Sequence, residues 1–211
     1  MARSPDSPPI IMLSLLPKSE QRASHYVNGL LSRLYSYVGQ FEAALSLFDF
    51  SNDQIEAVRT GPKANVPRTQ ELHRWKLMAA RDSAMTVYHF GKTTGGIRRS
   101  LSKMPTLRSK VDETKLRNAD KLLRKTFPDF EKFRHAISHA GDFGHDEDSY
   151  HRHGIRTAFG RGMVSNHLRD RTLSFTIAGQ LVRFEISREN LLALNSSKLS
   201  YYAAFKSAFY P

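Results

Sequence analysis

The chain has 211 residues, of which 40% are hydrophobic and none is cysteine. This size and apolar content suit one folded domain with a hydrophobic core, and the lack of cysteine excludes disulfides, thiolate metal sites and cysteine nucleophiles. The 32 Lys and Arg exceed the 20 Asp and Glu by 12. Such an excess favours a polyanionic partner, nucleic acid first and an acidic membrane surface second. A basic protein without such a partner is the alternative.

The first 17 residues are predicted to form a flexible leader. Their apolar run from Ile10 to Leu16 is much shorter than the ~18 residues that a membrane helix requires. The residues before it lack the basic character of a signal peptide, apart from Arg3. We therefore expect the apolar end of the leader to dock on the folded part. We also expect a cytoplasmic protein without membrane attachment, as suits a cysteine-free chain.

Apolar residues at three- and four-residue steps predict long helices over residues 18–49 and about 68–90. The apolar stripe of the first helix consists of Tyr26, Leu30, Leu34, Val38, Phe41, Leu45 and Phe48. Residues 53–59 are expected to add a turn or two. Residues 92–99, which contain two glycines, leave open whether the second helix continues with a kink or breaks.

Two further helices are predicted next. Asp112 and Glu113 begin the first of them, because acidic side chains are favourable at the positive end of a helix dipole. This helix ends at Phe127. Pro128 begins the next helix, in which Phe130, Phe133 and Ile137 fall on one apolar face. This helix closes at Gly141 as a C-terminal cap.

Beyond residue 154 the hydrophobic period changes to two, which predicts strands over residues 173–177 and 182–186 with a hairpin turn between them. Residues 163–168 are a candidate third strand. From about Arg188 the chain returns to helix. The predicted fold is mainly α: an up-and-down bundle of about four long helices, followed by a small antiparallel β-hairpin or three-stranded meander and a C-terminal helix.

The predicted organisation is one structural domain overall. After the leader, residues 18–141 form the bundle, and residues 142–211 pack on it with a loop rich in His and acidic residues, the hairpin and the last helix.

Positive charge is concentrated in one part of the chain. From Lys92 to Arg134 there are 13 Lys or Arg and 5 Asp or Glu, a net charge of +8. Each single charge is consistent with a solvated helix face, but the cluster is typical of a surface that binds phosphates. The residues expected to bind nucleic acid are Arg98, Arg99, Lys103, Arg108, Lys110, Arg124 and Lys125.

The next segment carries a candidate catalytic group, Arg134, His135 and His139. An arginine is always charged, whereas a histidine can exchange a proton near neutral pH. Together they could hold a phosphate and move a proton, as RNA cleavage requires. Five residues correspond to about 500° on a helix, so the first and last side chains diverge by ~140°. They act together only if the ligand lies across the helix or a second subunit completes the site.

Two other interpretations of the same residues remain open. Arg134 could pair with Glu131 or Asp142 while His139 caps the helix. Alternatively, His135 and His139, four apart, could bind a metal with side chains of the loop from Asp142 to His153. The spacing fits no fixed zinc signature, so we predict no metal and no other cofactor.

The segment Arg134-His135-Ala136-Ile137-Ser138-His139 resembles the motif of the HEPN superfamily: Arg, a polar residue, three variable residues and His, late on a bundle helix. The polar residue is commonly Asn, and here it is His135. The resemblance covers about residues 18–141. It implies an up-and-down bundle, usually dimeric, with paired motifs lining a cleft at the dimer interface. Many members are metal-independent ribonucleases, and others are binding or dimerisation modules.

For this chain the resemblance implies that Arg134 holds the scissile phosphate. His139 is the general acid or base while the RNA 2′-hydroxyl attacks, and His135 hydrogen-bonds the phosphate or orients its partner. We therefore expect an RNA-binding homodimer, a candidate metal-independent endoribonuclease of toxin or phage-defence type with an antitoxin or other protein partner. A non-catalytic module that binds nucleic acid or an acidic protein is the alternative, and a third is an unrelated helical bundle.

Overall fold

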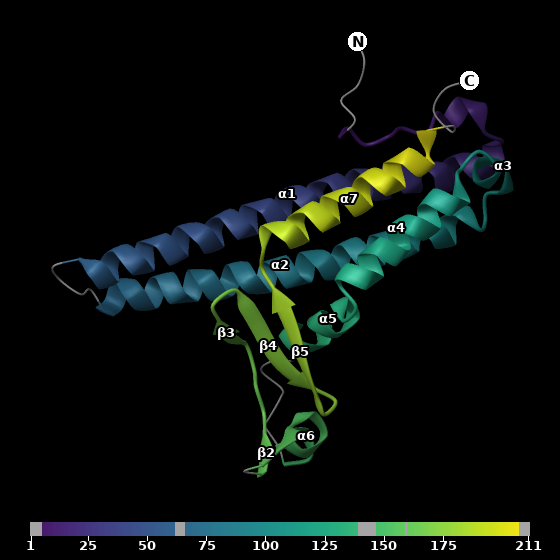
Figure 1. Ribbon diagram of the computed structural model, residues 1–211. Coiled ribbons are helices and arrows are strands. Elements are labelled where there is room, and N and C mark those ends of the chain that lie inside the picture. Colours follow the sequence, from purple (N-terminus) through teal and green to yellow (C-terminus); the bar gives the residue numbers. More distant parts are fainter. Residues whose placement is uncertain (1–5, 62–65, 139–146, 159, 207–211) are drawn as a thin grey trace. The chain divides into compact units, whose positions relative to one another are not determined.

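The computed structural model describes residues 6–61, 66–138, 147–158 and 160–206 (Figure 1). It is mainly helical, with a small antiparallel three-stranded sheet before the C-terminal helix, as predicted. None of the described helices combines the length and apolar character needed to cross a membrane. The elements are η1 (Leu13–Leu15), α1 (Lys18–Thr60), α2 (Val66–Leu101), α3 (Pro105–Ser109), α4 (Glu113–Thr126), α5 (Phe130–Ser138), α6 (Glu147–His153), β1 (Ile155–Thr157), β2 (Gly160–Gly162), β3 (His167–Arg169), β4 (Thr172–Ile177), β5 (Gln180–Glu185) and α7 (Arg188–Ala204).

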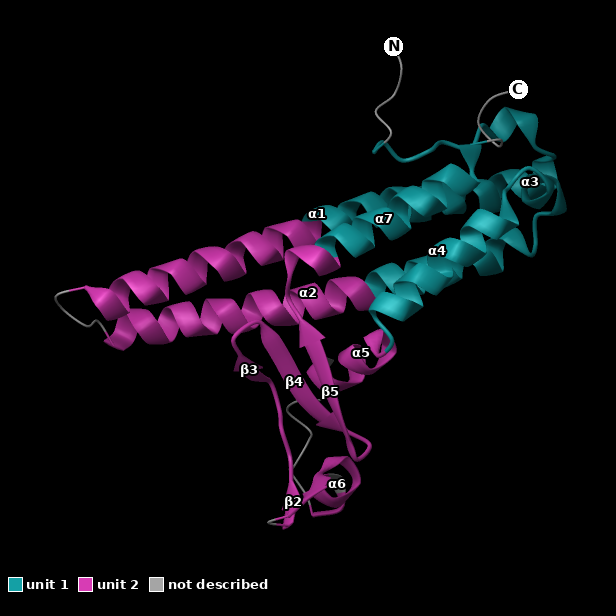
Figure 2. Ribbon diagram, in the orientation of Figure 1, with its two compact units in different colours: residues 1–39, 89–128, 191–211 teal, residues 40–88, 129–190 magenta. Residues whose placement is uncertain are grey.

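The contacts divide the chain into two compact units (Figure 2). Unit 1 comprises residues 1–39, 89–128 and 191–211, and unit 2 comprises residues 40–88 and 129–190. The long helices α1 and α2 each contribute one part to unit 1 and another to unit 2.

The helix α1 continues without a break through residues 53–59. Most of its predicted apolar stripe is buried, including Leu30, Leu34 and Phe48. Tyr26 is an error in that prediction, because its side chain is 55% exposed while Val27 is fully buried. The ring of Tyr26 looked apolar in the pattern, but the helical period places the smaller neighbour against the core.

The helix α2 also continues, through the two glycines that left its end open. A Cβ atom on Gly96 would lie only 3.3 Å from Cδ1 of Leu30. The glycine therefore permits a close approach of α2 to α1 in unit 1.

Unit 1 is a helical bundle of α1, α2, α4 and α7 with the short α3. Aliphatic side chains of α1 and α4 and the rings of Tyr201 and Tyr202 on α7 are buried. The Tyr202 hydroxyl donates to the C=O of Leu31 (2.9 Å), which fixes α7 against α1. The α4 helix begins as predicted, because the Asp112 carboxylate accepts the N–H groups of Thr114 and Lys115.

The apolar end of the predicted leader docks on unit 1. Ile11 is buried, and its backbone N–H donates to Oδ1 of Asn28 (2.7 Å) while its C=O accepts from Nδ2 of the same residue (3.1 Å). Closer to the N-terminus, the Asp6 carboxylate lies 3.3 Å from the Lys198 ammonium of α7. Residues 1–5 lie outside the described part of the chain.

Unit 2 places α5 against a three-stranded antiparallel sheet of order β3-β4-β5. The ring of Phe133 on α5 meets Phe184 of β5 edge-to-face, with 5.1 Å between ring centres, and Phe41 of α1 meets Phe184 in the same way. The ion pair of Arg171 and Asp49 (2.6 Å) joins the start of β4 to α1. This aromatic core fixes α5 in the unit.

The β4–β5 hairpin confirms the predicted strands. Phe175 pairs with Val182, and Ala178 and Gly179 form the two-residue turn with φ of 50° and 72°. Positive φ at both positions is characteristic of a type I′ turn, whose backbone twist matches the right-handed twist of the flanking strands. The third strand, β3, is shorter than the predicted 163–168 and begins at His167. A separate hairpin of β1 and β2 was not predicted.

Candidate functional site

The predicted motif lies on the last turns of α5 in unit 2. This helix begins at Phe130, and Phe130, Phe133 and Ile137 form its buried face, as predicted. Arg134 and His135 project from the other side and are exposed to solvent. The buried face orients α5 so that both polar side chains can reach a ligand.

The guanidinium of Arg134 lies over the ring of Tyr88 on α2, with its carbon 5.9 Å from the ring centre. Among the described residues Arg134 forms no ion pair, so it does not pair with Glu131. The other predicted partner, Asp142, lies outside the described residues. A cation–π contact orients the side chain without neutralising its charge. The positive charge therefore stays available to a phosphate.

A second arginine of α2 holds the end of α5. Nη2 of Arg81 donates to the C=O of Ile137 (3.4 Å), one of the terminal carbonyl groups that the helix leaves without a partner. Arg81 and Tyr88 are seven residues apart, so both lie on one face of α2. Sequence reasoning missed both as site residues. Their seven-residue spacing indicates that they share a face of α2. No local sequence pattern indicates that this face contacts α5.

His139, the predicted general acid or base, lies outside the described residues, as does the predicted cap Gly141. The alternative interpretation, a metal site, also depends largely on that segment, which includes Asp142 and His145. In the described part of the chain, no group of three His, Asp or Glu is placed to hold a metal ion. His153 Nδ1 instead accepts the N–H of Ala178 (3.2 Å), and burial, with Arg152 nearby, lowers the pKa of this histidine.

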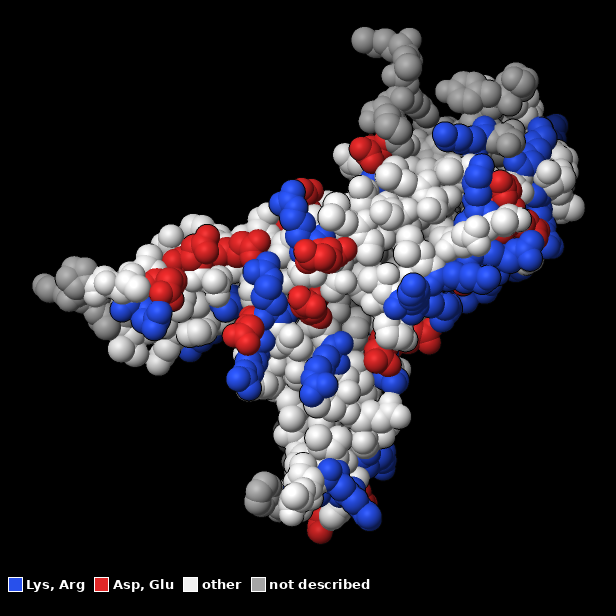
Figure 3. Space-filling model, viewed as in Figure 1, with Lys and Arg blue, Asp and Glu red and all other residues white. Residues whose placement is uncertain are grey.

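The predicted nucleic-acid-binding residues all belong to unit 1 and are all exposed. Figure 3 shows Lys and Arg side chains covering much of the visible surface of α4. Two of them share one carboxylate: Asp120, 17% exposed, lies 2.9 Å from Arg98 and 3.5 Å from Arg124. The seven residues are Arg98 and Arg99 at the end of α2, Lys103 after it, Arg108 on α3, Lys110 after it, and Arg124 and Lys125 on α4.

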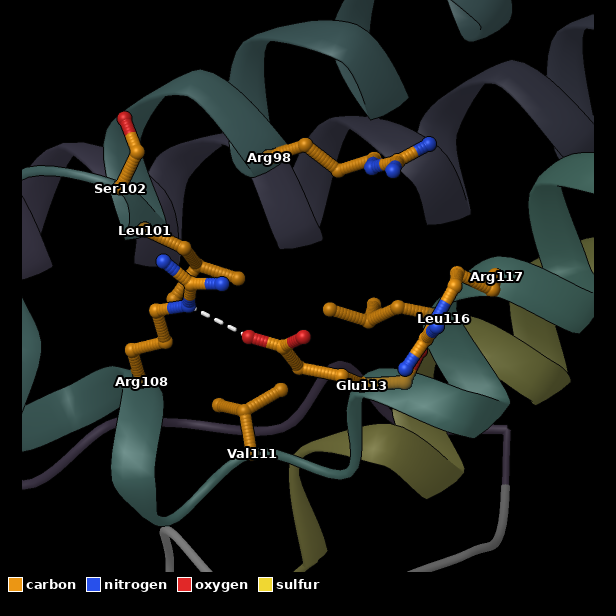
Figure 4. A pocket seen from close by; sticks show the side chains of 8 residues that line it. All are labelled: Arg98, Leu101, Ser102, Arg108, Val111, Glu113, Leu116 and Arg117. Atoms are coloured by element: carbon orange, nitrogen blue, oxygen red, sulfur yellow. Dashed lines mark hydrogen bonds and ion pairs between the residues drawn. The ribbon is translucent and has the colours of Figure 1, made fainter.

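A pocket of about 240 Å³ lies among these basic residues in unit 1 (Figure 4). Arg98 lies on one side of it, and the ion pair of Arg108 with Glu113 lies across from Arg98. Nε of Arg117, one helical turn after Glu113, donates to the backbone C=O of Glu113 (3.3 Å). The hydrogen bond from Arg108 is the main cause that lowers the pKa of Glu113, so this carboxyl is ionised at neutral pH. The remaining lining residues are Leu101, Ser102, Val111 and Leu116.

Sequence reasoning included Arg98 and Arg108 but missed Glu113 and Arg117. Their four-residue spacing on a helix is a detectable signal. The sequence carries no comparable signal that α2, α3 and α4 converge on one pocket.

The two units differ sharply in charge. The residue ranges of unit 1 contain 17 Lys or Arg and 5 Asp or Glu, a net charge of +12, whereas those of unit 2 contain 15 of each and are neutral. The entire formal excess of the chain therefore belongs to the unit that holds the basic surface and the pocket. Comparison with known proteins adds no relative: no family model, no curated protein and no solved structure matches this chain.

Proposed function

We propose that this protein is a HEPN-like RNA-binding protein that cleaves RNA without a metal ion. Arg134 carries the proposal: its guanidinium is exposed, oriented by Tyr88 and not paired with any carboxylate among the described residues. A fixed, charged fork of this kind can take a phosphate through two parallel hydrogen bonds. The helical fold and the motif resemblance support the same assignment, and the +12 charge of unit 1 supports a polyanionic substrate.

In the proposed reaction the 2′-oxygen of RNA attacks the adjacent phosphorus while the bond to the 5′-oxygen breaks. One base accepts the 2′-hydroxyl proton, and one acid donates a proton to the leaving 5′-oxygen. His139 supplies one of these roles, and His135 binds the phosphate or orients the reacting groups. Arg134 stabilises the negative charge on the non-bridging oxygens. The products are a 2′,3′-cyclic phosphate and a 5′-hydroxyl.

A cleavage assay in EDTA tests this proposal. End-labelled single-stranded RNA is incubated with the wild type, Arg134→Ala and His139→Ala, and with Arg183→Ala as a control that removes an exposed arginine from β5. We expect the wild type and the control to produce 2′,3′-cyclic phosphate ends. Both motif variants should be slower by about 10²-fold or more. An all-deoxy strand of the same sequence should stay intact, because it has no 2′-hydroxyl.

A second candidate function, RNA binding without cleavage, is favoured by a different observation. All seven predicted binding residues belong to unit 1, which does not contain the motif. RNA bound by all four proteins but cleaved by none would establish this alternative. Cleavage that persists in Arg134→Ala and His139→Ala would instead show that the motif is not the catalytic site.

A further inference from the structure

The pocket of unit 1 contains more hydrogen-bond donors than its own acceptors use. Each guanidinium carries five N–H donors. In the described part of the chain Arg98 donates to Asp120, Arg108 to Glu113 and Arg117 to the Glu113 backbone, one hydrogen bond each. Most donors of the three arginines therefore remain for a ligand.

The charge of the lining favours a dianion. Three arginines and one glutamate give the pocket a net charge of +2. A phosphate monoester carries about −1.5 to −2 charges at pH 7, whereas each internal phosphate of RNA carries one. A terminal phosphate therefore matches this lining better than a phosphate inside a strand does.

The size and the walls of the pocket favour an end group. Its volume of about 240 Å³ is below the ~300–1,000 Å³ of pockets for drug-sized ligands. The apolar lining residues Leu101, Val111 and Leu116 point their side chains into the space from different sides, between the arginines (Figure 4). A phosphate with its attached sugar presents both a charged group and an apolar ring face to such a pocket.

The arginines of this pocket are held in place before a ligand arrives. The ion pairs with Asp120 and Glu113 anchor Arg98 and Arg108, which come from α2 and α3. Such anchoring lowers the conformational entropy that binding would otherwise cost. Glu113, however, also places a negative charge in the pocket, and it competes with an anionic ligand for Arg108.

We propose that this pocket binds a phosphate monoester, from either the 5′ end of an RNA strand or a free nucleotide. The first source rests on the proposed function of RNA binding. The proposed cleavage leaves a 5′-hydroxyl on its downstream product, which lacks the group that the pocket takes. A strand bound through this pocket must therefore obtain its 5′-phosphate from a different reaction, one that leaves or adds a terminal phosphate.

Fluorescence anisotropy with the full chain tests the RNA source. Two 2′-O-methyl oligonucleotides, which cannot be cleaved by 2′-hydroxyl attack, carry a 3′ fluorophore and either a 5′-phosphate or a 5′-hydroxyl. We expect the phosphorylated strand to bind about tenfold more tightly. Arg98→Gln and Arg108→Gln should bring this ratio close to one. Arg33→Gln should preserve the ratio, because this exposed arginine of α1 in unit 1 belongs neither to the pocket lining nor to the predicted nucleic-acid-binding residues.

Glu113→Gln gives the sharpest readout, because loss of fold cannot mimic it. Removal of the competing carboxylate should raise the preference for the 5′-phosphate severalfold. Isothermal titration with adenosine 5′-monophosphate, adenosine and inorganic phosphate tests the free-nucleotide source with the same variants.

The outcomes separate the two proposals. Preference for the 5′-phosphate that depends on Arg98, Arg108 and Glu113 supports the RNA end as the ligand. Binding of adenosine monophosphate but not of RNA supports the pocket as a nucleotide site and contradicts the proposed function. Equal binding of the two RNA strands without nucleotide binding overturns the pocket proposal and leaves RNA binding intact. No binding of any of these ligands overturns both.

Discussion

Unit 1 and unit 2 carry different chemistry. Unit 1 holds the whole net charge of +12 and two of the nine histidines, whereas unit 2 is neutral overall and its ranges hold seven histidines, including both histidines of the motif. Uncompensated positive charge attracts a polyanion, and groups that titrate near neutral pH move protons. Under the proposed function, substrate binding and acid–base chemistry would therefore fall in different parts of this chain. Affinity and cleavage rate should therefore respond to different substitutions.

The largest expected effect separates catalysis from binding at Arg134 in unit 2. Lysine keeps the charge but cannot form the bidentate contact with a phosphate, so Arg134→Lys should slow cleavage at saturating RNA by about 10²-fold. RNA affinity should change by less than about twofold, because unit 1 supplies the binding charge. Single-turnover kinetics and anisotropy measure the two quantities, with Arg183→Lys as the control. Equal losses in rate and affinity would contradict the separation.

The converse experiment removes charge from unit 1. The triple substitution of Lys103, Lys110 and Lys125 by Gln should weaken RNA binding at least about tenfold at physiological salt. It should also reduce the slope of log affinity against log salt by about 2, three contacts at ~0.7 each for a single strand. The matched triple in unit 2 replaces the exposed Arg156, Arg169 and Arg183 by Gln and should change affinity little. Similar losses of RNA affinity in the two triple variants would show that affinity depends on the total charge of the chain and not on how the charge is divided between the units.

Sequence patterns predicted local features of both units well. The Asp112 cap of α4, the buried face of α5 and the turn at Ala178-Gly179 each depend on residues within a few positions of one another. Tyr26 failed because a tyrosine counts as apolar in a periodic pattern even where its ring faces water.

The division into units could not be predicted in this way. A periodic pattern identifies the buried face of α1 and α2, but it does not indicate that the packing partners change along each helix. The same limit applies to the sites. The contacts of Tyr88 with Arg134 and of α2, α3 and α4 around the pocket join segments that are distant in sequence. The +8 cluster of residues 92–134 was therefore visible, whereas the complete charge division was not.

A smaller effect is expected from the carboxylate that anchors α3 in unit 1. Glu20 is buried and accepts the N–H groups of Thr106 and Leu107, each at 3.0 Å. Burial alone would raise its pKa, but these backbone hydrogen bonds outweigh it and lower the pKa below 4.5. A carboxyl with a depressed folded-state pKa contributes stability above its unfolded pKa, and the contribution is lost as the pH falls through the folded value.

Glu20→Gln should therefore reduce the free energy of unfolding by about 1 kcal/mol at pH 7, and the difference from wild type should shrink as the pH falls below 4.5. Urea titrations at several pH values measure this difference. Hydrogen exchange should report lower protection in α3 and unchanged protection in the sheet of unit 2. Lower protection in both places would show that the two units are not energetically separate.

The smallest effect is expected at the β4–β5 turn of unit 2. Ala178 has a φ of 50°, a conformation that costs an L-residue with a plain Cβ roughly 1–2 kcal/mol and that asparagine tolerates better. Asn-Gly is also the preferred pair for this turn, so Ala178→Asn should raise the free energy of unfolding by about 0.5–1 kcal/mol. The same change at exposed Ala43 within α1 should lower it by about 0.5 kcal/mol, because asparagine is a poorer helix former than alanine. Urea denaturation measures both changes in the free energy of unfolding. An increase for Ala178→Asn together with a decrease for Ala43→Asn would show that the gain comes from the turn conformation. In Ala178→Asn, protection from hydrogen exchange should rise only in the sheet of unit 2. In Glu20→Gln, by comparison, protection should fall only around α3 of unit 1.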